Sequence, residues 1–132
     1  MKKNSSPNHY LSGLTITIGV MVIVLASSCS KNRHPYITIN KPANGQVFNA
    51  PDTIEIKADI YDTDAVTSEY LVVTKENATN DTIINFKDYQ FTDATYHLDK
   101  SFASQPATNY KIVVSAIGHD NLAGDTIHVR TN

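Results

Sequence analysis

The sequence contains a single cysteine, Cys29, and no tryptophan among its 132 residues. One cysteine excludes a disulfide within the chain, so any folded domain must be held together by packed side chains. Basic residues are not in surplus either, since 11 Lys and Arg stand against 13 Asp and Glu. A nucleic-acid-binding domain usually carries a basic face, and the charge balance therefore argues against that class.

Long apolar runs are scarce as well, and the longest, Leu14–Ala26, lies near the N-terminus. It follows Lys2, Lys3 and a polar stretch, which is the order found in a signal peptide. A membrane-spanning helix needs about 20 apolar residues, so this run is short for a stable anchor. Small residues at 26–28 then lead directly to Cys29.

This arrangement resembles the signal peptide of bacterial lipoproteins, which is cleaved before a cysteine that is then acylated. The resemblance implies a signal peptide at 1–28, lipidation of Cys29 by fatty acids such as palmitate, and a short tether at 29–34. The pattern departs from the family's at one place, because Leu25 is four residues before the cysteine and Ala26 has the usual leucine position. Ordinary secretory cleavage and an uncleaved anchor stay open as alternatives.

Lipidation would explain a lone cysteine, because a thioether carries no redox chemistry. Mature bacterial lipoproteins typically carry three acyl chains, and several chains hold a protein stably on a membrane. The expected location is therefore the cell envelope, most simply the outer membrane of a Gram-negative bacterium. No acidic run follows Cys29, and such runs resemble surface-export signals, so the leaflet stays open.

The remainder of the chain has the size of one domain, residues 35–132. Loss of residues 1–28 removes two lysines, which leaves 9 basic and 13 acidic residues and a formal charge of −4. Apolar residues alternate along Thr53–Tyr61 with period two, which is typical of a strand with one buried face. Similar short segments are 36–40, 69–75, 82–86, 95–99, 109–116 and 125–131. About seven such strands predict an all-β fold, a single antiparallel β-sandwich.

Two stretches carry a resemblance to a known family. The segment NYKIVVSAIGHDNLAGDTIHV, Asn109–Val129, resembles the last two strands of bacterial immunoglobulin-like domains, and Ile37–Phe48 is similar to their opening strand. The resemblance covers about residues 35–132 and implies an Ig-like sandwich. It also suggests that Tyr110 forms a tyrosine corner, with a buried ring and a hydroxyl bonded to nearby backbone; an ordinary buried aromatic is the alternative.

Acidic and threonine residues form two possible sites. Asp62 and Asp64 follow the second strand, and Asp120 and Asn121 lie before the last, at the same end of such a fold. Their oxygens could bind Ca²⁺, although Asp and Asn also serve simply as turn formers. The tripeptide Asp-Thr-Ile occurs three times and resembles an O-glycosylation sequon of gut bacteria. The resemblance implies glycans on Thr53, Thr82 and Thr126. The alternative is that each tripeptide simply marks the start of a strand.

Catalytic motifs are missing from the sequence, and the histidines have no metal-ligand spacing. We therefore expect no enzyme and no cofactor, with Ca²⁺ the one ion considered. The expected function is a non-catalytic binding or interaction module of the cell envelope, with Asp62–Val66 and Ile117–Ala123 as contact loops. The alternative is an accessory protein that binds Ca²⁺ or a glycan, with Lys87–Phe91 as an exposed aromatic loop for a sugar. Its partners would be the membrane, through the lipid, and an envelope protein or glycan.

Overall fold

The computed structural model describes residues 34–77, 79–89, 94–118 and 121–132. These residues form strands and no helix, and none of them lies in a helix that could cross a membrane. Cys29 and the predicted signal peptide lie outside the described residues. The strands are β1 (Tyr36–Lys41), β2 (Val47–Phe48), β3 (Thr53–Tyr61), β4 (Ser68–Lys75), β5 (Thr82–Tyr89), β6 (Thr95–Ala103), β7 (Asn109–Ile117) and β8 (Leu122–Thr131).

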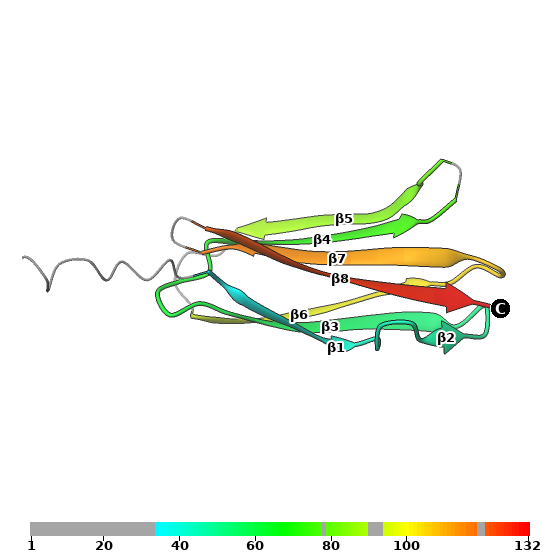
Figure 1. Ribbon diagram of the computed structural model, residues 1–132, viewed down its shortest axis with the longest axis horizontal. Coiled ribbons are helices and arrows are strands. Elements are labelled where there is room, and N and C mark those ends of the chain that lie inside the picture. Colours follow the sequence, from blue (N-terminus) through cyan, green and yellow to red (C-terminus); the bar gives the residue numbers. More distant parts are fainter. Residues whose placement is uncertain (1–33, 78, 90–93, 119–120) are drawn as a thin grey trace, which may run out of the picture. The chain divides into compact units, whose positions relative to one another are not determined.

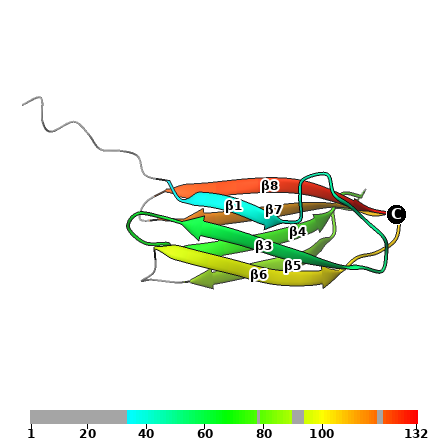
Figure 2. The ribbon, with the colours of Figure 1, turned by 90° about the horizontal axis from the view of Figure 1, so that it is seen from below.

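The strands form two sheets that pack face to face (Figure 1, Figure 2). One sheet has three strands in the order β1-β3-β6, and the other has five in the order β2-β8-β7-β4-β5. All pairs are antiparallel except β2 with β8, which run parallel. The predicted all-β sandwich is therefore confirmed, whereas the expectation of a wholly antiparallel one is wrong at β2.

The core lies between the sheets and follows from the period-two pattern. In β3 the side chains of Ile54, Ile56 and Ile60 are fully buried, while Glu55 between them is exposed. In β7 every second residue, beginning with Tyr110, is likewise fully buried. Complete burial of one large aliphatic side chain contributes about 1.5–3 kcal/mol, so these two strands supply much of the driving force for folding.

Tyr110 has the tyrosine-corner geometry. Its ring is fully buried and meets the ring of Phe102 edge to face, with centroids 5.0 Å apart. Its hydroxyl accepts a hydrogen bond of 2.7 Å from the backbone N–H of Gln105. The hydroxyl thus has a hydrogen-bond partner at the edge of the core, as a buried tyrosine usually does. This part of the sequence prediction is confirmed.

Two boundaries differ from the prediction. The strand β2, Val47–Phe48, was not expected, because a two-residue parallel pairing leaves no periodic pattern in the sequence. The strand β5 continues through Lys87 to Tyr89, where an aromatic loop was expected. The backbone of β4 keeps pairing with these residues, since Ser68 lies opposite Tyr89. Backbone pairing here extends the strand past the point where apolar alternation ends.

Candidate functional site

The outer face of the five-stranded sheet carries an aromatic group around one lysine. Tyr70 in β4 and Lys87 in β5 lie opposite each other in the register, and Tyr89 follows two residues along β5 on the same face. The Lys87 Nζ atom is 4.8 Å from the Tyr70 ring centroid and 4.5 Å from that of Tyr89. These distances are within the range of cation–π attraction. We call Tyr70, Lys87 and Tyr89 the tyrosine–lysine cluster.

The two tyrosines stabilise the positive charge of Lys87. Hydrogen bonding with Tyr89, then with Tyr70, raises the pKa of Lys87, so the ammonium stays charged throughout the physiological range. The hydroxyl of Ser68 lies 3.3 Å from that of Tyr70, and this hydrogen bond together with Lys87 lowers the pKa of Tyr70. Tyr89 is 57% exposed. The result is an accessible aromatic surface that carries a positive charge on the outer face of the sheet.

The loops that were predicted to bind Ca²⁺ do approach each other, since Asp62 packs directly against Gly118. Asp62 is buried, and its Oδ1 accepts a hydrogen bond of 3.0 Å from the N–H of Asp64, which is the turn-forming alternative. The backbone oxygen of Asn121 accepts a hydrogen bond from the N–H of Gly118. Asp120 lies outside the described residues. Among the described residues no group of three or more acidic, His or Cys side chains could hold a metal. The Ca²⁺ site stays a prediction.

The three threonines of the Asp-Thr-Ile repeats are all exposed. Thr53 begins β3 and Thr82 begins β5, as the strand-start interpretation expects. Thr126 is different because it lies inside β8, and the N–H of Thr126 bonds to the side chain of Asp125 at 2.8 Å. The strand-start interpretation is therefore wrong for Thr126, and O-glycosylation stays a prediction for all three.

The expected contact loops are only partly accessible. Val66 is fully buried, and Asp62 is 2% exposed, so two of the residues in Asp62–Val66 belong to the interior. Leu122 is 65% exposed, but it lies in β8. The first of these loops therefore offers a partner less surface than the sequence predicted.

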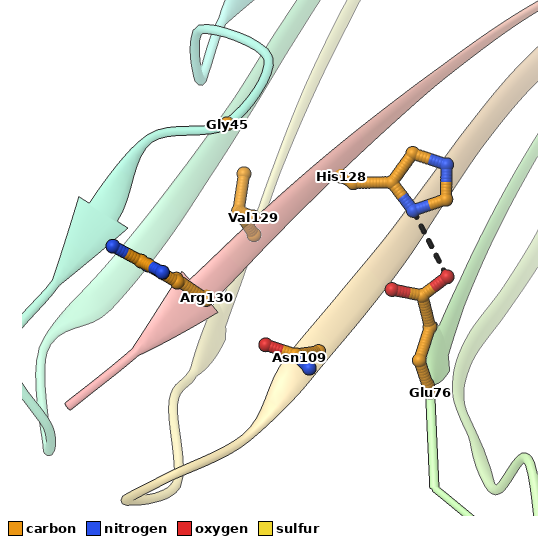
Figure 3. Close-up of a pocket in the computed structure, with 6 residues that line it drawn as sticks. All are labelled: Gly45, Glu76, Asn109, His128, Val129 and Arg130. Carbon is orange, nitrogen blue, oxygen red and sulfur yellow. Dashed lines mark ion pairs between the residues drawn. The ribbon is translucent and has the colours of Figure 1, made fainter.

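A small pocket lies at the other end of the five-stranded sheet, where β7 and β8 approach the loop before β2 (Figure 3). Its volume is about 230 Å³. It is lined by Gly45, Glu76, Asn109, His128, Val129 and Arg130. The His128 Nδ1 atom is 2.9 Å from Glu76 Oε1, and both side chains are more than a third exposed. Water screens such an exposed pair strongly, so it contributes little to the binding of a ligand.

Sequence reasoning missed the partners of the outward-facing histidines. It placed His97 and His128 on solvent-facing sides, and both are exposed. His97 Nδ1 lies 2.6 Å from Asp59 Oδ1 on the neighbouring strand, and this hydrogen bond, then that of Asn40, lowers the pKa of Asp59. Glu76 reaches His128 from the end of β4. No local signal joins residues this far apart in the chain; only the sheet register does.

Solved structures with a similar fold belong to a much larger protein. A β-glucosidase from Listeria innocua, in complex with isofagomine, matches with a TM-score of 0.50 at 7% identity, over 76% of this chain and 16% of that chain. The same enzyme without this ligand matches with a TM-score of 0.49 at 10% identity, again over 76% and 16%. The chain thus spans about a sixth of these proteins, and the likeness concerns the fold alone. No curated protein matches the chain.

The family model gives a direct assignment. A model described as bacterial Ig domain matches residues 35–114, which is more than half of the chain. The matched region runs from the residue before β1 into β7 and so includes strands of both sheets, while β8 lies beyond it. A bacterial Ig domain suggests a non-catalytic module. The chain belongs to the bacterial Ig domain family.

Proposed function

We propose that the protein is a lipid-anchored module of the cell envelope that binds a partner protein through the tyrosine–lysine cluster. The observation that supports it most is the exposed Tyr89 beside Lys87 on the outer face of the five-stranded sheet. Tyrosine is enriched in protein interfaces because it buries a large area with little loss of side-chain entropy. The charge of Lys87 suits an acidic partner surface. Fatty acids on Cys29 hold the domain at the membrane.

Binding is tested with envelope extracts and full-length protein purified in detergent. Replacing Tyr89 by alanine should lower the captured amount of a specific partner about tenfold, which corresponds to about 1.4 kcal/mol. Tyr36→Ala is the matched control, because Tyr36 is also an exposed tyrosine but lies in the other sheet. Equal capture by both variants would show that the tyrosine–lysine cluster is not the contact surface.

The anchor is tested separately. Mass spectrometry of the membrane-extracted protein should find acyl chains on residue 29, and Cys29→Ser should move the protein to the soluble fraction. A mature chain that starts at residue 29 without acyl groups would contradict the anchor, and binding through the cluster could still hold.

A glycan partner is the second candidate, because Lys87 beside an accessible tyrosine ring also suits an acidic sugar. On a glycan array the protein would then select sugars that carry carboxylates. Tyr89→Ala would abolish this binding, and Phe91→Ala offers a second variant. Binding of neutral and acidic glycans alike would count against this candidate.

A further inference from the structure

The outer face of the three-stranded sheet is polar, with an aromatic pair at one end. Along β1, β3 and β6 its outward residues are threonines, a serine, charged residues, Asn40, His97 and Ala103, with only two tyrosines among them. Ion pairs cross this face, such as Lys57–Asp99 at 3.3 Å. The two tyrosines are Tyr36, 72% exposed, and Tyr61, 45% exposed. They are partners in the register of β1 and β3, so they form one aromatic pair.

The position of the Tyr36–Tyr61 pair is as specific as its composition. Tyr36 begins β1 and Tyr61 ends β3, so the pair lies at the end of the sandwich opposite the C-terminus (Figure 1, Figure 2). Leu122, the first residue of β8, is also exposed, but it belongs to the five-stranded sheet and lies in one register row with Ser68 and Tyr89. The two tyrosines are thus the large exposed aromatic side chains of the three-stranded sheet at the end at which the described chain begins.

The sequence links the Tyr36–Tyr61 pair to the proposed acylated residue by a short segment. Cys29 precedes Tyr36 by seven positions. A fully extended chain covers at most about 3.6 Å per residue, so these positions span at most about 25 Å. If residue 29 is held in a bilayer, Tyr36 must stay within this distance of it, with Tyr61 directly beside Tyr36 in the register.

We propose that the Tyr36–Tyr61 pair contacts the headgroup layer of the bilayer that holds acylated Cys29. This inference rests on the proposed lipid anchor. Tyrosine favours membrane interfaces because its ring is apolar and its hydroxyl hydrogen-bonds with water or headgroups. The pair would turn this end of the outer face of the three-stranded sheet toward the lipid, and so fix the orientation of the domain.

The orientation has a consequence for the tyrosine–lysine cluster. Tyr36 and Tyr61 lie on the outer face of the three-stranded sheet, whereas the tyrosine–lysine cluster lies on the outer face of the five-stranded sheet. Contact through the tyrosine pair therefore leaves Lys87 and Tyr89 in water, available to a partner. A cross-strand aromatic pair also stabilises a sheet by itself, by about 0.2–1 kcal/mol, but that role requires no lipid. The two roles differ in whether the rings meet the bilayer.

The absence of tryptophan makes this difference measurable. Full-length acylated protein carrying Tyr36→Trp is reconstituted in vesicles of phosphatidylcholine and phosphatidylethanolamine, with part of the lipid brominated near the headgroup. We expect at least a twofold loss of tryptophan emission and a shift to shorter wavelength, and a similar result for Tyr61→Trp. Tyr89→Trp is the matched control from the same end, and Val47→Trp, 40% exposed in β2, is the control from the other end. Neither control should be quenched.

The outcomes separate the two proposals. Acylated protein with equal quenching at positions 36, 61, 89 and 47 overturns the membrane contact and leaves the anchor standing. Quenching at 89 as strong as at 36 overturns the proposed orientation. Protein that lacks acyl chains and does not float with the vesicles overturns the anchor and, with it, the contact.

Discussion

At the scale of single residues, Glu69 is an unusual feature of the interior. It is 3% exposed on β4, and its Oε2 atom has no hydrogen-bond partner among the described residues. Burial, then the nearby carboxylate of Asp88, raises the pKa of Glu69, while Lys100 lowers it in part. A carboxylate that is harder to ionise in the folded state destabilises that state at neutral pH. The net effect on folding is unfavourable above the raised pKa.

Replacing Glu69 by glutamine should therefore raise the free energy of unfolding at pH 7 by about 1 kcal/mol. In the native protein Glu69 binds its proton more tightly when folded, so its destabilising effect fades as pH falls through the raised pKa. Below the ordinary glutamate pKa of 4.5 the free energies of unfolding of the two proteins should converge. Urea unfolding between pH 4 and 8 measures this, with Glu55→Gln, an exposed glutamate in β3, as control. A variant that is less stable at pH 7 would contradict the prediction.

At the scale of elements, the contact between the 62–67 connection and the end of β7 depends on one glycine. A Cβ atom on Gly118 would overlap Asp62 Oδ2 and lie 3.1 Å from Pro35 Cγ. Gly118→Ala should therefore lower the free energy of unfolding by about 1–3 kcal/mol, as overpacking does. Gly124→Ala is the matched control, because its nearest neighbour would be at 3.5 Å.

The double variant Gly118→Ala with Asp62→Ala distinguishes this clash from a general intolerance of side chains at 118. Removal of the Asp62 carboxylate should restore part of the loss in urea unfolding, so the two changes would not be additive. Additive losses would show that the close approach of Asp62 and Gly118 does not control stability.

The elements also show how far the sequence could predict the fold. Period-two patterns located β3 and β7 almost residue by residue, because each has one buried face. The same reasoning missed β2, whose two residues are placed by pairing with β8. It predicted Tyr89 as an exposed aromatic residue but could not join it to Tyr70, because only the register of β4 and β5 brings them together. Local patterns locate strands, and pairing between strands builds the candidate site.

At the scale of the whole molecule, net charge should modulate the proposed membrane contact. The chain from residue 29 onward has a formal charge of −4, and Asp64 is an exposed carboxylate at the end that carries the Tyr36–Tyr61 pair. Residues 35–132 hold 7 basic and 13 acidic residues, so an anionic bilayer repels the domain, while the acyl chains and the basic Lys31 and Arg33 of the tether still hold the chain on the vesicle. Adding anionic lipid should therefore weaken the contact of the pair without releasing the protein.

The Tyr36→Trp protein measures this on brominated vesicles that contain about 30% anionic lipid. Quenching should be weaker than on zwitterionic vesicles at low salt, where the Debye length is about 30 Å at 0.01 M. Salt near 1 M shortens this length to about 3 Å and should restore the quenching. Apolar contact does not weaken in salt, so recovery would indicate that the rings, rather than charges, make the contact. Stronger quenching on anionic lipid would mean that basic groups bring the domain to the bilayer. The Tyr36–Tyr61 pair would then not be the group that makes the contact.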